Sequence, residues 1–305
     1  MTLFAELCAT TNFSFLRGAS HPEELAFTAR DLGLAGIGVA DRNTLAGVVR
    51  AHAAAKEAGL RLAVGARLVF QDGAPDILVY PVDRAAYGRL TKMLTIGNRR
   101  APKGECHLNF EDFLAHAEGQ QAIITPEIAA GAAPDRRLRE TLERVRRSCS
   151  EAWLAARFCF DGEDRRRLAQ LRALAHETGA RLLATTEPLF HEAGRRALAD
   201  VLTCIREKTT LDAAGRRLAA NAERHLKPPQ EMARLYRDAP EAVEETARFL
   251  ETAKFSLDDL RYNYPDETIA GYADAQAALE DLTLKGAAKR YPGGTPDKVR
   301  EALTR

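Results

Sequence analysis

Residues 36–68 of this 305-residue chain, GIGVADRNTLAGVVRAHAAAKEAGLRLAVGARL, contain the pattern from which its fold can be predicted. Short apolar runs at 36–40 and 62–70 flank a helical pattern over 43–58. Asn43 opens that pattern and Gly59 closes it, because asparagine is a preferred N-cap and glycine a preferred helix end. A strand, a helix and a second strand in this order predict two parallel strands joined by a helical crossover.

The same alternation continues on both sides of this unit. Further apolar runs lie at 3–8, 76–81, 121–125, 152–158 and 181–185, and helical patterns lie at 22–33, 84–97, 110–117, 135–148 and 164–178. The run at 76–81 follows QDGAP, which indicates a tight turn rather than a helix. Seven strands with mostly helical crossovers predict an α/β fold, a distorted seven-stranded β/α barrel, with a doubly wound open sheet as the alternative. No GxGxxG or GxxxxGK[ST] motif follows a strand, which argues against a nucleotide-binding open sheet.

The strand pattern stops after residue 190 and helical patterns replace it. They lie at 192–208, 228–237 and 239–253. We therefore predict a barrel with a helical C-terminal extension over 1–255, an acidic linker over 256–274, and further helices over 275–305. The chain stops inside its last helical pattern, which predicts that it is a piece of a longer protein.

Composition excludes several classes of protein. Apolar residues make up 46% and charged residues 29%, so the chain can bury a core and is not disordered as a whole. The formal net charge is +1, which excludes a polycation that binds nucleic acid by charge alone. Five cysteines without a CxxC pattern do not suggest disulfides or a zinc ribbon. With no apolar run long enough to span a membrane and no secretion signal, we expect a cytoplasmic protein.

The strand ends are the positions to search for chemistry, because β/α barrels place it at the C-terminal ends of their strands. The residues expected there are Cys8, Thr10, Asp41, Arg42, Arg67, Pro81, Thr125, Thr186 and Glu187, with His191 slightly further on. A divalent metal site needs three or four converging carboxylate or imidazole ligands. Two carboxylates, one displaced histidine and two arginines that repel a cation do not meet that need. We therefore expect no metal and no catalytic residue at this end of the barrel.

Each candidate also has a structural interpretation. Cys8 is a potential nucleophile, but a small thiol at a strand end is typical of a buried apolar residue. Asp41 is either a ligand or base, or a strand-end cap, and His191 is expected to flank the following helix. Cys106 and His107 lack a second ligand pair at zinc spacing. The arginines of 135–148 and 164–178 are expected on solvated helix faces rather than on a nucleic-acid-binding stripe.

Several segments resemble one known family. The segment TNFSFLRGASHPEEL (11–25), the opening stretch at 36–68, HLKPPQEM (225–232) and GAAKRYPGG (286–294) resemble the N-terminal polymerase-and-histidinol-phosphatase (PHP) domain of bacterial C-family DNA polymerases. The similarity is closer to the error-prone, damage-inducible branch than to the replicative one, and it covers essentially the whole chain. It implies a PHP-like barrel, with 275–305 leading toward the polymerase palm and thumb. The palm carboxylates would lie beyond Arg305, so we expect no polymerase activity from this chain alone.

The resemblance also implies which positions would hold metals in active PHP domains. They are a His-x-His after the first strand, an Asp-His pair after the second, a glutamate on the third, and a late Asp-x-His. The matching residues here are Cys8, Thr10, Asp41, Arg42, Arg67, Glu187 and Leu189. Only Asp41 and Glu187 retain a carboxylate. We therefore interpret the site as vestigial, and we expect Arg67, more than Arg42, to form a salt bridge with Asp41 or Glu187 in place of the lost metal.

The function that follows is a PHP domain with a structural, scaffolding role in error-prone, translesion DNA synthesis and DNA repair. The resemblance implies a polymerase core in the same chain, DNA, magnesium and deoxynucleotides for the intact enzyme, and damage-response accessory proteins and a sliding clamp as wider partners. We expect no cofactor in this chain and no membrane partner. One alternative is a residual metal-dependent phosphoesterase or 3′–5′ exonuclease. Another is a protein-interaction platform on the arginine-rich helices 135–148 and 164–178.

Overall fold

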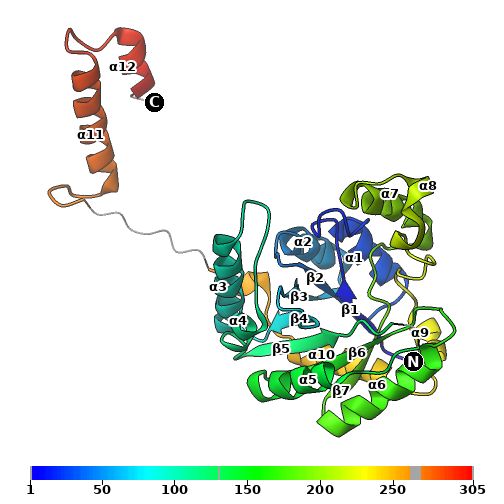
Figure 1. Ribbon diagram of the computed structural model, residues 1–305. Coiled ribbons are helices and arrows are strands. Elements are labelled where there is room, and N and C mark those ends of the chain that lie inside the picture. Colours follow the sequence, from blue (N-terminus) through cyan, green and yellow to red (C-terminus); the bar gives the residue numbers. More distant parts are fainter. Residues whose placement is uncertain (1, 130, 262–268, 304–305) are drawn as a thin grey trace. The chain divides into compact units, whose positions relative to one another are not determined.

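A computed structural model describes residues 2–129, 131–261 and 269–303 of the chain. By its internal contacts the chain divides into two compact units, Met1–Leu260 and Arg261–Arg305. The first unit holds all seven strands of the sheet (Figure 1). The second holds two helices, α11 (Ala275–Arg290) and α12 (Asp297–Leu303).

The seven strands follow one another in the sheet in the order of the sequence. They are β1 (Ala5–Ala9), β2 (Gly36–Arg42), β3 (Arg61–Leu68), β4 (Asp76–Pro81), β5 (Gln120–Thr125), β6 (Glu151–Arg157) and β7 (Arg181–Thr185). Strand β4 pairs antiparallel with both β3 and β5, and every other neighbouring pair is parallel. The short connection from β3 cannot hold a crossover helix, so β4 has to run back along its neighbour.

Helices connect most of the strands and cover the sheet (Figure 1). Each parallel pair is joined by one helix: α1 (Pro22–Asp31), α2 (Val48–Ala58), α5 (Arg136–Ser148) or α6 (Asp164–Thr178). Helices α3 (Arg84–Arg100) and α4 (Phe110–Leu114) lie between the antiparallel strands β4 and β5. After β7 come α7 (Arg196–Arg206), α8 (Leu211–Ala214), α9 (Pro229–Leu235) and α10 (Glu241–Thr252), with short 3-10 turns at Ala193–Arg195, Gly215–Arg217 and Leu257–Asp259. No helix of the described residues is long and apolar enough to cross a membrane.

Glu6 joins the two edge strands and so nearly closes the barrel. Its side chain lies in β1, is 1% exposed, and accepts hydrogen bonds from the end of β7. The Thr185 hydroxyl lies 2.5 Å from Oε1, and the Thr186 amide and hydroxyl lie 2.9 and 3.0 Å from Oε2. Because a buried carboxylate is costly unless hydrogen-bonded, these donors fix the spacing of the two strands.

The barrel interior is filled with side chains, and α10 covers its lower end. An apolar cluster takes residues from all seven strands, including Tyr80 and Trp153, together with Phe249 and Leu250 of α10. The Thr246 hydroxyl accepts a hydrogen bond of 3.0 Å from the amide of Ala5, which starts β1. Helix α10 therefore covers the N-terminal ends of the parallel strands and leaves the opposite end open.

The predicted seven-stranded β/α barrel with a helical C-terminal part is confirmed. One helix start was wrong: Asn43 does not open α2, which begins at Val48. Asn43 instead has a φ of 50°, and its side-chain Oδ1 accepts a 2.9 Å hydrogen bond from the Val69 amide. This bond ties the end of β2 to the end of β3. Of the predicted acidic linker, residues 262–268 lie outside the described part of the chain.

Candidate functional site

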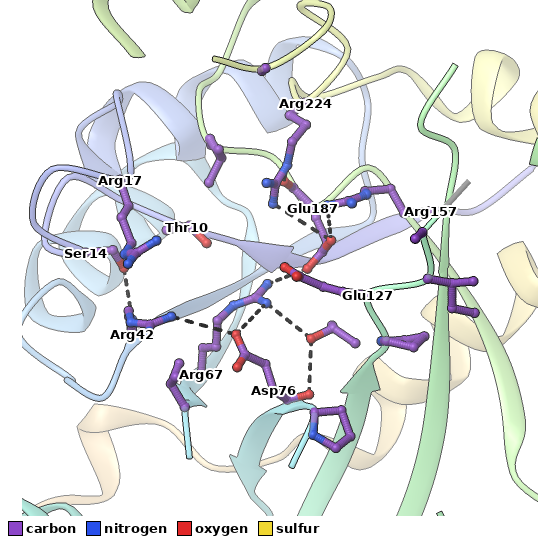
Figure 2. Close-up of a pocket in the computed structure, with 18 of the residues that line it drawn as sticks. Thr10, Ser14, Arg17, Arg42, Arg67, Asp76, Glu127, Arg157, Glu187 and Arg224 are labelled. Atoms are coloured by element: carbon purple, nitrogen blue, oxygen red, sulfur yellow. Dashed lines mark hydrogen bonds and ion pairs between the residues drawn. The ribbon is translucent and has the colours of Figure 1, made fainter. Parts of the chain in front are cut away.

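The open end of the barrel, which we call the mouth, contains a cavity of about 950 Å³ (Figure 2). Its wall combines strand ends with the loops that follow them and with α7. Nine arginines line it: Arg17, Arg42, Arg67, Arg137, Arg157, Arg196, Arg206, Arg217 and Arg224. Five carboxylates oppose them: Asp76, Glu127, Asp135, Glu187 and Asp200. A chain with a net charge of +1 thus concentrates positive charge at one end of its barrel.

Glu187 is the anionic centre of the mouth. It follows β7 with a φ of 44°, a left-handed conformation that is uncommon outside glycine and turns the side chain into the cavity. Its Oε1 lies 2.7 Å from Arg67 Nη2, and its Oε2 lies 2.6 Å from Arg157 Nη1 and 3.8 Å from Arg224 Nη2. Burial raises the pKa of Glu187, but the three guanidinium groups outweigh it and hold the pKa well below its usual range.

Arg67 crosses the floor of the mouth and contacts two other strands and the residue Glu187, which follows β7. From β3 its Nη1 lies 3.5 Å from Asp76 Oδ2 at the start of β4 and 3.2 Å from Thr125 Oγ1 at the end of β5. Its Nη2 reaches Glu187 (Figure 2). Burial lowers the pKa of Arg67, but Glu187 and Asp76 outweigh it and raise the pKa above its usual value. A permanent cation is therefore fixed in the centre of the mouth.

Asp41 does not take part in this ion-pair network. Its carboxylate is fully buried at the end of β2 and accepts hydrogen bonds from the loop that follows β1. Oδ1 accepts from the Thr11 amide at 2.9 Å and the Ser14 hydroxyl at 2.7 Å, and Oδ2 accepts from the Thr11 hydroxyl at 2.7 Å. Of the two interpretations left open by the sequence, the contacts agree with a strand-end cap.

The remaining sequence-predicted positions lie partly at the mouth and partly away from it. Cys8 is fully buried in the barrel core, and burial raises the pKa of its thiol well above the usual value. Thr10 and Leu189 line the cavity wall. Arg42 Nη1 lies 4.0 Å from Asp76 Oδ2. His191 lies outside the wall, where its Nδ1 is 2.8 Å from the Ser20 hydroxyl.

Several residues of the mouth escaped the sequence analysis. Pro81 was taken as the end of β4 at the mouth, but β4 is antiparallel, so its first residue, Asp76, lies there instead. The predicted tight turn at QDGAP already indicated that β4 runs antiparallel to β3. Arg157 is the last residue of β6, so the predicted strand at 152–158 could have placed it at the mouth. Arg224 had no local signal, because a bridge between Phe190 and His225 brings its segment to the mouth.

The donor set of the mouth suits anions rather than metal ions. The described residues contain no group of three or more His, Cys, Asp or Glu side chains that could hold a metal. Glu187 is already bound by guanidinium groups, and Asp41 is occupied by hydroxyl and amide donors. A cation placed beside Arg67 would also meet its fixed positive charge.

The match to a family model agrees with this fold. Residues 7–194 match the model of the PHP domain, which spans β1 to the turn before α7. The chain belongs to the PHP domain family. That match includes the strand ends at the mouth but stops before Arg224, which comes from the helical extension. The arginine arrangement around Glu187 therefore combines residues of the PHP domain with one from outside the matched region.

Curated relatives of this PHP chain are DNA polymerases. It is 51% identical to an error-prone DNA polymerase of Caulobacter vibrioides over 297 residues, and 48% identical to one of Rhodopseudomonas palustris over 305 residues. These alignments cover 97% and 98% of this chain but 27% of each relative's length. A solved structure of a proposed metal-dependent phosphoesterase from Bifidobacterium adolescentis is also similar, with 16% identity, a TM-score of 0.47, and coverage of 61% of this chain and 88% of that one.

Proposed function

We propose that this chain is the PHP module of an error-prone bacterial DNA polymerase and that its role is structural. The observation that carries the proposal is the buried Arg67–Glu187 ion pair, which occupies the centre of the mouth. A guanidinium held there by Glu187 and Asp76 places a fixed positive charge where catalytic metals would bind, which supports a degenerate site. The module would then scaffold the polymerase core rather than hydrolyse phosphoesters.

The proposed context follows from the similarity to error-prone DNA polymerases over nearly the whole chain. In that context the domain 1–255 and the linker 256–274 precede helices that lead into the polymerase core of the same protein. DNA, deoxynucleotides and magnesium would be bound by the intact enzyme during translesion synthesis in DNA repair. Damage-response accessory proteins and a sliding clamp would be its partners in the bacterial cytoplasm.

A chimeric polymerase tests the scaffolding role. The matching region of the Caulobacter relative is replaced by this chain, and primer extension is measured on an undamaged template and on one with an abasic site. We expect the chimera to extend primers, and we expect deletion of the region to abolish extension and lower the melting temperature. A deletion that extends primers at full rate would show that the module is not a scaffold.

An assay of phosphodiester hydrolysis tests the alternative of a residual metal-dependent phosphoesterase. The purified chain is incubated with bis(p-nitrophenyl) phosphate and added manganese, zinc or magnesium. We expect no release of nitrophenol above that of a matched sample of Asp41→Ala. Release that persists through purification and is lost in Asp41→Ala would overturn the proposed degenerate site.

A further inference from the structure

A second group of arginines lies in the mouth, away from Glu187. Arg17 follows β1, Arg42 ends β2, and Arg206 ends α7. Figure 2 shows Arg17 and Arg42 around Ser14, on the opposite side of the cavity from Arg157. Arg206 Nη1 donates to the carbonyl of Leu16, the residue before Arg17, and all three arginines line the same cavity. Burial lowers the pKa of Arg17, and the charges of Arg42 and Arg206 lower it further. Like charges gathered in this way are unfavourable unless an anion joins them.

The protein supplies little negative charge to this second group. Within the described residues, the Arg17 side chain has no hydrogen bond or ion pair. The carboxylate nearest to Arg42 is Asp76 at 4.0 Å, and Asp76 is shared with Arg67. Arg206 Nε lies 3.0 Å from Glu207 Oε1, and its Nη1 donates to the Leu16 carbonyl at 2.7 Å. Donors of all three arginines therefore remain for a ligand in the cavity.

The loop that carries Arg17 is held in place before any ligand arrives. Asp41 binds Thr11 and Ser14, and the Ser14 hydroxyl accepts a 2.9 Å hydrogen bond from the Arg42 amide. One buried carboxylate thus couples the loop of Arg17 to the backbone of Arg42. Gly18 follows at a position where a Cβ atom would overlap the Thr11 carbonyl, so only glycine allows this tight packing. Such preorganisation lowers the entropic cost of binding.

We propose that Arg17, Arg42 and Arg206 form a metal-independent binding site for a phosphoryl oxyanion in the mouth. A guanidinium group presents a planar fork of N–H donors that matches the oxygens of a phosphate. Three guanidinium groups suit a multiply charged phosphoryl group better than a single carboxylate, which has two oxygens and one charge. The cavity of about 950 Å³ also lies in the size range of sites for nucleotide-sized ligands.

Three sources could supply this phosphoryl group: free pyrophosphate, the triphosphate of a deoxynucleotide, or the terminal phosphate of a DNA strand. The recognition chemistry is the same for all three. No bond is made or broken in the proposed site, so it needs no metal. The proposal stands apart from the scaffolding role, because it concerns binding to the isolated chain and not polymerase activity.

Calorimetric titration of the 305-residue chain tests this site. Sodium pyrophosphate, deoxyadenosine triphosphate and a 5′-phosphorylated oligothymidylate are titrated at low ionic strength in the presence of EDTA. The same oligonucleotide without its 5′-phosphate, and a polyglutamate peptide, are the comparison ligands. We expect saturable binding of at least one phosphorylated ligand, and the strongest of the three identifies the source of the phosphoryl group.

Matched variants decide whether the arginines are responsible. We expect Arg17→Gln and Arg42→Gln each to weaken binding at least about tenfold, as expected for the loss of charge-assisted hydrogen bonds. Arg17→Lys should fall in between, because it keeps the charge but lacks the fork. Arg30→Gln is the control, since Arg30 lies in the last turn of α1, near the covered end of the barrel. Thermal melts of all variants confirm that each one folds.

Several binding results would overturn the proposed phosphoryl site. Absence of binding by every phosphorylated ligand would do so, as would binding of polyglutamate with an equal or higher affinity. Pyrophosphate binding that Arg17→Gln and Arg42→Gln leave unchanged would place the anion elsewhere. Binding that appears only when EDTA is omitted from the titration would show that a metal ion, rather than the guanidinium groups, holds the ligand.

Discussion

Arg67 Nη2 and Glu187 Oε1 lie 2.7 Å apart across the mouth of the barrel, although 120 positions separate the two residues in the sequence. The side chains are 12% and 9% exposed, so water screens their interaction only weakly. Glu187 also binds Arg157 and Arg224, and Arg67 also binds Asp76. The pair is therefore the centre of a largely buried network in which Arg67 and Glu187 each have more than one partner of opposite charge.

Removing the charge of Glu187 should destabilise the domain strongly. Glu187→Gln leaves three partly buried guanidinium groups without their shared anion, and we expect a loss of about 3–5 kcal/mol in the free energy of unfolding. Urea denaturation measures this loss. Glu57→Gln on the exposed face of α2 is the control and should change stability little. A change equally small in both variants would show that the network does not stabilise the fold.

The contribution of Glu187 should depend on pH in a defined direction. Because its folded-state pKa is depressed, the stability it adds is fully present above the unfolded pKa of about 4.3 and is lost as the pH falls toward the folded value. The difference in melting temperature between the unmodified protein and Glu187→Gln should therefore shrink as the pH falls below that unfolded value. A difference that stays constant between pH 7 and the acid limit of folding would contradict this.

Reversing the charge of Arg67 should destabilise the folded domain more than removing that charge. Arg67→Glu places a third carboxylate beside Glu187 and Asp76, whereas Arg67→Met leaves Glu187 with two arginines. We expect Arg67→Glu to melt below Arg67→Met by an amount that corresponds to several kcal/mol. Crowding raises the pKa values of the carboxylates, so this gap should narrow as the pH falls. Equal melting temperatures at neutral pH would refute the prediction.

Asp41 should be needed to order the loop after β1. Asp41→Asn replaces one acceptor oxygen by an amide donor that faces the Thr11 and Ser14 donors, and we expect a cost of about 1–3 kcal/mol. Amide hydrogen exchange should rise at Thr11 and Arg42, whose N–H groups depend directly on Asp41 or on Ser14. Unchanged protection of both amides would show that the loop is held by other contacts.

Substitution of a glycine in the barrel interior should destabilise the protein. A Cβ atom at Gly65 would lie 2.5 Å from ring carbons of Tyr80, which is fully packed in the core. We expect Gly65→Ala to lower the free energy of unfolding by about 1–3 kcal/mol. Gly88 lies in α3 with open space around its missing Cβ, so Gly88→Ala should raise stability by about 0.5–1 kcal/mol. Chemical denaturation tests both expectations: the free energy of unfolding should fall in Gly65→Ala and rise in Gly88→Ala.

The sequence was sufficient to predict the strands and much of the mouth, because local patterns determine both. Strands show as short apolar runs, and residues at their ends gather at one end of a parallel barrel. This placed Arg67 and Glu187 in one site. Asp76 was missed because its strand runs backward, and Arg224 because a loop beyond β7 brings it there. Contacts that depend on such long connections leave no periodic signal.

Glu6 also has a consequence for how the protein folds during its synthesis. Its partners Thr185 and Thr186 follow it by 179 and 180 residues, and the bond from Ala5 to Thr246 spans 241 residues. A chain that emerges from the ribosome from its N-terminus cannot satisfy β1 until most of the domain has been translated. Closure is therefore a late event of high contact order, and the nascent chain carries an unfinished sheet edge until β7 and α10 have emerged.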